Sequence, residues 1–74
     1  MVEVFRTDIT DHFLATMLVA EIRKNFSDYT ANFDLEDCDR ILRVKCSEGR
    51  IQSSLLISLV NRFGHHAEVL PDSD

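Results

Sequence analysis

Residues 29–46 read YTANFDLEDCDRILRVKC, and two alternating runs within them predict a β-hairpin. Residues 36–39 form the acidic turn between the runs. We expect Ile41 to face outward with Arg43 and Lys45. The residues expected to face the core are Ala31, Phe33, Leu35, Leu42, Val44 and Cys46.

Helical periodicity flanks this hairpin on both sides. Before it, apolar residues repeat every four positions up to Phe26, after a turn at residues 7–11 that holds candidate N-caps. After it, Ser47 is predicted to cap a second helix that ends at Gly64. The predicted core-facing residues of the two helices are Leu14, Leu18, Ile22 and Phe26, then Ile51, Leu55, Leu59 and Phe63 with Leu56 and Val60 beside them.

Short strands are predicted at residues 2–6 and 66–70. The resulting order, β-α-β-β-α-β, is the ferredoxin-like arrangement of the α+β class, with one antiparallel sheet and two helices on one face. Right-handed crossovers favour the strand order 4-1-3-2. We therefore predict one domain over residues 1–71, followed by a short acidic tail at 72–74.

The formal net charge of −5 argues against a nucleic-acid partner, because phosphate binding depends on clustered Lys and Arg. No apolar run approaches the length of about 20 residues that a bilayer requires, so no membrane insertion is expected. The N-terminus lacks the basic start of a signal peptide, which makes a cytoplasmic location the expectation. Cys38 lies in the predicted turn and Cys46 at the far end of the return strand, too far apart to bridge, and both are expected to stay reduced.

The predicted topology brings three turns to one end of the domain: residues 7–11, 36–39 and 64–66. All three histidines of the chain lie near this end, and imidazole and carboxylate groups together bind divalent zinc, copper or nickel. The candidate metal ligands are His12, His65, His66 and Asp11, with Asp8 nearby. The alternative is that they are solvated surface residues. No cofactor is expected otherwise.

Catalysis is not predicted. The sequence suggests no Ser-His-Asp set and no Gly-rich phosphate loop, and a domain of this size leaves little volume for a water-excluding cleft. More informative is the side of the first helix opposite its core-facing stripe, where Phe13, Met17 and Ala20 fall in one line. We predict that these three residues bind a protein partner, together with the first turn.

The hairpin start, Phe33-Asp34-Leu35-Glu36, and the ending from Leu59 through Gly64-His65-His66-Ala67-Glu68-Val69-Leu70 carry a family resemblance. The chain resembles the small heavy-metal-associated domains of the copper-chaperone family over nearly its whole length. That family binds metal through a Cys-x-x-Cys pair at the first turn. Here the corresponding positions lie within Thr10–Ala15 and contain no cysteine, so the thiolate site is missing.

The resemblance implies that the docking surface of metal-carrying relatives, the first loop and first helix, is what this chain retains. Our leading hypothesis is a non-enzymatic, metal-chaperone-like binding or interaction module. The alternatives are a metal-binding or transport protein that uses His and Asp ligands, and an ACT-like regulatory domain for a small molecule. The absence of glycine from residues 7–11 weakens the ACT-like alternative.

Overall fold

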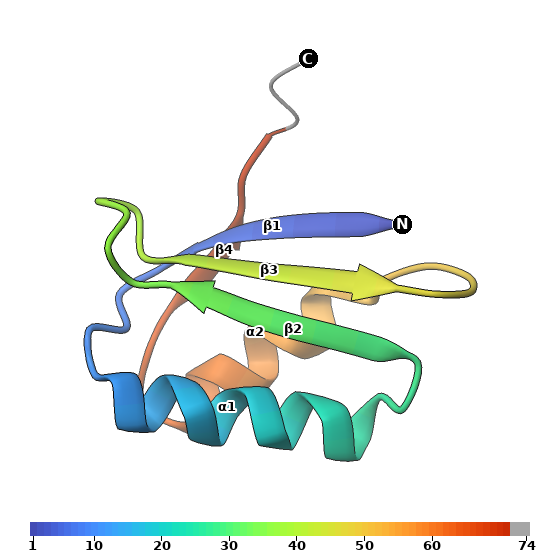
Figure 1. Cartoon of the computed structure of the whole chain (residues 1–74), viewed down its shortest axis with the longest axis horizontal. Coiled ribbons are helices and arrows are strands. Elements are labelled where there is room, and N and C mark those ends of the chain that lie inside the picture. Colours follow the sequence, from blue (N-terminus) through green and yellow to red (C-terminus); the bar gives the residue numbers. More distant parts are fainter. Residues whose placement is uncertain (72–74) are drawn as a thin grey trace.

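The computed structural model describes residues 1–71, and the predicted acidic tail at 72–74 lies outside the described residues. The secondary-structure order is β-α-β-β-α-β, which confirms the predicted α+β, ferredoxin-like fold (Figure 1). The elements are β1 (Val2–Thr7), α1 (His12–Asn25), β2 (Tyr29–Asp34), β3 (Ile41–Cys46), α2 (Ser53–Arg62) and β4 (Ala67–Val69).

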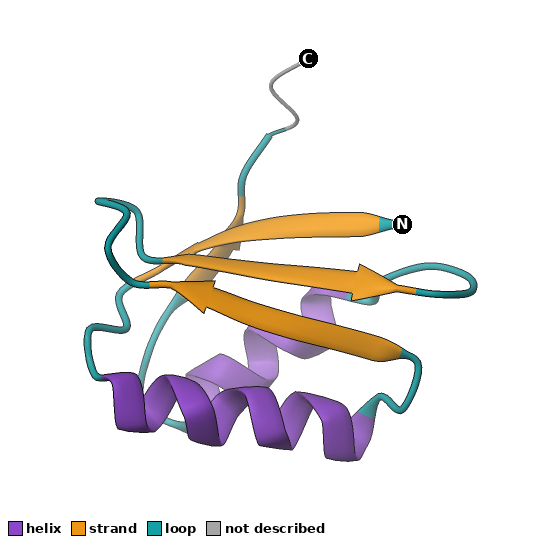
Figure 2. Cartoon of the chain, in the orientation of Figure 1, coloured by secondary structure: helices purple, strands orange, loops and turns teal. Residues whose placement is uncertain are grey.

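The four strands form one antiparallel sheet in the order β2-β3-β1-β4, which is the predicted order. Both helices lie on the same side of this sheet (Figure 2). The opposite side of the sheet carries polar residues on its outermost long strand: Thr30, Asn32 and Asp34 are all exposed. The result is a two-layer domain with one helix-covered face and one open face.

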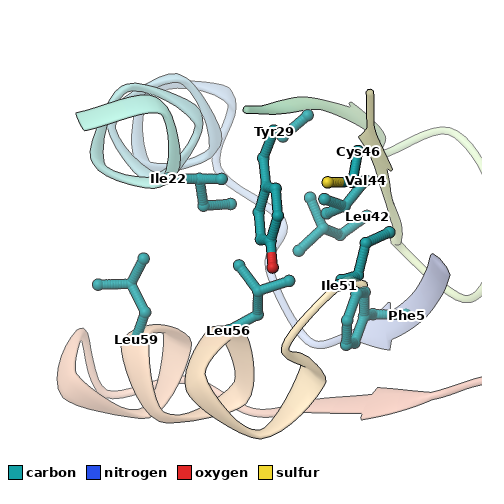
Figure 3. Close-up of a cluster of buried hydrophobic side chains, with 10 residues drawn as sticks. Phe5, Ile22, Tyr29, Leu42, Val44, Cys46, Ile51, Leu56 and Leu59 are labelled. Atoms are coloured by element: carbon teal, nitrogen blue, oxygen red, sulfur yellow. The ribbon is translucent and has the colours of Figure 1, made fainter. Parts of the chain in front are cut away.

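The core lies between the sheet and the helices. Its main cluster contains fully buried side chains from every layer, and Tyr29 stands at its centre (Figure 3). The labelled members are Phe5, Ile22, Tyr29, Leu42, Val44, Cys46, Ile51, Leu56 and Leu59. A second cluster of Ile9, Ala15, Leu18 and Val60 lies under the first turn and anchors the start of α1.

Helix α2 begins at Ser53, so the predicted cap at Ser47 is wrong. Ser47 instead donates its amide to Asp28 O at 3.2 Å and so extends the β2–β3 pairing. The segment that follows is held by the Tyr29 hydroxyl, which donates to Arg50 O at 3.1 Å and accepts from the Gln52 amide at 2.7 Å. The strand pairing therefore continues to Ser47, the residue predicted to cap the helix, and α2 begins six residues later.

The later start of α2 also changes which of its residues face the core. Leu56, Leu59 and Val60 are buried, whereas Leu55 is 47% exposed, so its predicted core position is wrong. In β3, Ile41 shares the outward face with Arg43 as predicted, yet it is only 7% exposed and belongs to neither core cluster. Gly64 adopts the left-handed conformation predicted for a helix end, with φ of 82°.

Candidate functional site

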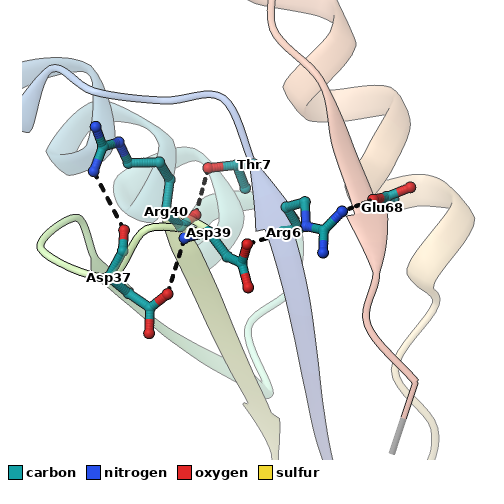
Figure 4. Close-up of polar contacts among 6 residues, drawn as sticks. All are labelled: Arg6, Thr7, Asp37, Asp39, Arg40 and Glu68. Atoms are coloured by element: carbon teal, nitrogen blue, oxygen red, sulfur yellow. Dashed lines mark hydrogen bonds and ion pairs between the residues drawn. The ribbon is translucent and has the colours of Figure 1, made fainter.

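Three turns meet at one end of the domain, as the topology predicted. The Thr7 amide donates to Asp39 O at 3.1 Å, and the Thr7 hydroxyl donates to Arg40 O at 2.6 Å (Figure 4). The Asp8 amide donates to His66 O at 3.4 Å. The end of β1 is thus bonded both to the hairpin turn and to the segment that leads into β4.

Arg6 ties the outer surfaces of these strands together. Its Nε lies 3.3 Å from Asp39 Oδ1, and its Nη1 lies 3.1 Å from Glu68 Oε1 (Figure 4). About half of the Arg6 side chain is exposed, and exposed ion pairs of this kind contribute less than about 1 kcal/mol each. The arrangement orients the turn more than it stabilises the domain.

The hairpin turn has an unusual backbone at Arg40, a non-glycine residue with φ of 47°. The Asp37 carbonyl accepts from the Arg40 amide at 3.0 Å, and Asp37 Oδ1 accepts from the Asp39 amide at 2.9 Å. The Arg40 guanidinium reaches back and donates to Leu35 O at 2.9 Å. A left-handed conformation costs a non-glycine residue about 1–2 kcal/mol, which these bonds offset.

Asp8 connects to both neighbouring histidines of the β4 corner. Its Oδ1 accepts the His66 amide at 2.9 Å and lies 3.2 Å from His65 Nδ1. Partial burial raises the pKa of Asp8, but the His66 amide bond and the His65 contact together outweigh it and lower that pKa below its ordinary value. The carboxylate is therefore held ionised beside the histidine.

The remaining predicted metal ligands do not join this pair closely. Asp11 is the N-cap of α1, where its Oδ1 accepts the Phe13 amide at 2.9 Å, and His12 is the exposed first residue of the helix. Within residues 1–71, no three ligand atoms of Asp11, His12, His65 and His66 lie within 4.8 Å of one another. A metal site formed by these residues stays a prediction.

One group of possible ligands was not predicted: Asp37, Cys38 and Asp39, whose ligand atoms lie within 4.8 Å of one another. The acidic turn was visible in the sequence, but its compact backbone was not. Asp39 pairs with Arg6, and Asp37 caps the turn amide, so both carboxylates already have partners. The guanidinium beside this group opposes a cation there.

A hollow of about 300 Å³ lies between the ends of β1 and β4. Its charged walls come from Arg6, Asp8 and Glu68. Arg6 pairs with Glu68, and Asp8 bonds to the two histidines. Each of these three charged side chains therefore already has a partner within the domain.

The outer side of α1 carries the predicted apolar line. Phe13 is 74% exposed, Met17 is 43% exposed and Ala20 is exposed, opposite the buried residues Ala15, Leu18 and Ile22. With exposed Lys24, the intervals are four, three and four residues, the spacing at which one helix contacts another. We call Phe13, Met17, Ala20 and Lys24 the α1 stripe.

The two ends of the α1 stripe differ in charge. Asp8 and Asp11 lie before its first residue, and Arg23 and Lys24 lie in the last turn of the helix. All four are exposed. The stripe is thus an apolar surface with an acidic and a basic end.

Comparison of the chain with protein-family models, curated proteins and solved structures finds no match. The resemblance to heavy-metal-associated domains therefore stays a prediction based on the residues quoted above. No helix within the described part of the chain is long and apolar enough to cross a membrane.

Proposed function

We propose that this chain is a non-enzymatic protein-interaction module, similar to a heavy-metal-associated domain that lacks the thiolate site. In this proposal it binds a helix of a partner protein along the α1 stripe. The observation that carries the proposal is the exposure of Phe13 and Met17 in line on a helix whose opposite side buries Ala15, Leu18 and Ile22.

Single exposed apolar side chains are common, but a line at helix-contact spacing is not an isolated case. Burying a side chain such as Phe13 contributes about 1.5–3 kcal/mol. The small side chain of Ala20 lets a second helix approach α1 closely between Met17 and Lys24. These features suit a helical partner better than an extended one.

The charges of the stripe select the orientation of the partner. An antiparallel helix places its own first turn beside Arg23 and Lys24. Acidic residues are favoured in the first turn of a helix, because they interact with its positive dipole end. The proposed partner is therefore an amphipathic helix, antiparallel to α1, with an acidic first turn.

Site-specific photo-crosslinking in the source cell tests this proposal. A benzophenone side chain at position 17 should give one discrete adduct, whereas the same group at Ser58, an exposed position of α2, should not. The helix identified in the adduct is then made as a synthetic peptide and titrated into the purified chain. Phe13→Glu should weaken binding at least tenfold, and the matched variant Ser58→Glu should not.

Two results would refute the proposal: equal crosslinking from both positions, or a peptide that binds Phe13→Glu as tightly as the unaltered chain. Phe13→Glu should change the free energy of unfolding by less than about 0.5 kcal/mol, because the side chain is exposed. Loss of binding then reports on the surface rather than on the fold.

The second candidate, a divalent-metal protein with His and Asp ligands, is supported by the Asp8–His65 contact of 3.2 Å. Two such donors are fewer than a zinc site uses, so a third must come from another residue or from water. Calorimetric titration of zinc, copper and nickel into the reduced chain tests this candidate. Micromolar binding that is lost in both Asp8→Ala and His65→Ala would support it.

A further inference from the structure

Strand β2 forms one edge of the sheet, with β3 as its neighbour. The two strands pair without a bulge over six positions, from Tyr29 opposite Cys46 to Asp34 opposite Ile41. Figure 1 shows β2 at the front of the sheet with no strand beyond it. Its outer side is therefore available for pairing.

The hydrogen bonds of β3 identify which groups of β2 face outward. Cys46 exchanges bonds with Met1, at 2.9 and 3.0 Å, so its groups point toward β1. Successive residues of a strand direct their groups to alternate neighbours, so the β2 residue opposite Cys46, Tyr29, points away from β3. The same holds for Ala31 and Phe33.

The Tyr29 amide is bonded to Phe26 O at 3.0 Å. The N–H and C=O groups of Ala31 and Phe33 have no partner from elsewhere in residues 1–71. The strand is also firmly held, because the side chains of Tyr29 and Ala31 are buried against the helix layer. The outer edge of β2 therefore presents the N–H and C=O groups of Ala31 and Phe33, unpaired among the described residues, in fixed positions.

Natural sheet edges are usually protected by short length, lysine, proline or a bulge. The other edge strand, β4, has three residues and exposes Glu68. Strand β2 has six residues, contains neither lysine nor proline, and is uncharged from Thr30 to Phe33. Of the two edges, β2 is the one suited to accept another strand.

Acidic side chains flank this uncharged centre. Asp28, Asp34 and Glu36 are exposed. Asp34 is the last residue of β2 and lies on the same side as Thr30 and Asn32, whereas Asp28 and Glu36 lie in the turns that precede and follow the strand. A second copy of the chain fits poorly. In the register that bonds all free groups of Ala31 and Phe33 in both copies, the turn that contains Asp28 meets the turn of the other copy that contains Glu36, and the two carboxylates repel each other.

We propose that the β2 edge binds an extended segment of another protein as an antiparallel fifth strand, and that this segment carries Lys or Arg at both ends. The free groups of Ala31 and Phe33 supply four main-chain hydrogen bonds. The acidic flanks select the basic ends. Strand addition of this kind gives affinity through the main chain and specificity through alternate side chains.

Amide hydrogen exchange of the full chain with the synthetic peptide KVTVSVTVK tests this inference. When its centre lies opposite residue 32, the nine-residue peptide extends past both ends of β2 and brings its lysines near the turns that contain Asp28 and Glu36. It should slow exchange at the amides of Ala31 and Phe33 at least tenfold. The free edge amides of Ala67 and Val69 in β4 should not change, which provides an internal control.

The matched peptide EVTVSVTVE should bind at least tenfold more weakly. Asp34→Lys combined with Glu36→Lys should abolish this preference, because one end of the bound peptide then meets lysines and the other still meets Asp28; both replaced residues are exposed and tolerate the change. Ala31→Pro removes one outward N–H without removing a bond to β3, and it should abolish protection by KVTVSVTVK.

The inference fails if millimolar KVTVSVTVK leaves the Ala31 and Phe33 amides unprotected, or if the β4 amides are protected equally. It also fails if the chain alone forms a dimer that protects these amides, because the occupant is then a second copy. If Ala31→Pro does not fold, the charge-reversal variant decides the question alone. The α1 stripe takes no part in any of these measurements.

Discussion

Replacing Arg40 by alanine and by glycine separates two opposing effects at the hairpin turn. The residue has φ of 47°, which costs a non-glycine residue about 1–2 kcal/mol. Its guanidinium donates to Leu35 O at 2.9 Å and to Asp37 O at 3.3 Å. Alanine removes these bonds and keeps the strained backbone, whereas glycine removes both.

The bond to Leu35 O is partly buried, so its loss should cost about 1 kcal/mol. Arg40→Ala should therefore be less stable than the unaltered chain by about 1 kcal/mol. Relative to alanine, glycine relieves the backbone strain, which stabilises the fold by about 1–2 kcal/mol. Its greater freedom in the unfolded chain destabilises the fold by about 0.4–1 kcal/mol. Arg40→Gly should therefore be more stable than Arg40→Ala by about 0.5–1 kcal/mol.

Urea unfolding followed by far-ultraviolet circular dichroism measures these differences. A change of 1 kcal/mol moves the midpoint of thermal unfolding by about 4–8 °C in a domain of this size, which gives a second readout. Arg50→Ala is the control, since Arg50 is exposed and contributes its carbonyl rather than its side chain to the Tyr29 bond. Equal stability of Arg40→Ala and Arg40→Gly would refute the argument about backbone strain.

Two further predictions concern the site and α2. Asp8→Asn should remove one pH-dependent contribution to the free energy of unfolding. The folded-state pKa of Asp8 is lowered, so the ionised carboxylate stabilises the fold above the unfolded-state pKa, and this stabilisation is lost as pH falls through the folded-state pKa. In urea unfolding from pH 3 to 7, the difference in free energy of unfolding between the two proteins should shrink toward acid pH. The change in this difference should be less than about 1 kcal/mol, because the Asp8 side chain is 48% exposed. Leu56→Ala should lower the free energy of unfolding by about 2–4 kcal/mol in the same assay, and Leu55→Ala should lower it by less than about 1 kcal/mol. Equal losses would mean that Leu55 is a core residue after all.

The strand order and the meeting of three turns were predictable because they depend on periodicity and connection rules. Alternation at residues 29–46 identified the hairpin, and right-handed crossovers then determined the neighbours of each strand. The α1 stripe was predictable for the same reason, since a helix with one packed side must expose the other.

The start of α2 was not predictable from local signals. Ser47 is followed by Glu48, a common pattern at helix starts, but Ser47 is already bonded to Asp28 across the hairpin. The hydroxyl of Tyr29 then holds the segment up to Gln52. Both partners are distant in sequence, so a tertiary contact overrides a local preference. Likewise, the Asp8–His65 contact could not be predicted from the sequence, because it depends on how the end of β1 lies against the turn before β4.

The two proposed surfaces belong to the same half of the domain but point in different directions. The α1 stripe lies opposite the side of the helix that packs on the sheet, whereas the free groups of Ala31 and Phe33 lie in the plane of the sheet. A helix on α1 and a strand on β2 can therefore be bound together. Phe13→Glu should leave peptide protection at β2 unchanged, and Ala31→Pro should leave helix binding unchanged. Loss of both activities in either single variant would mean that the two surfaces are coupled through the packing of α1 on β2.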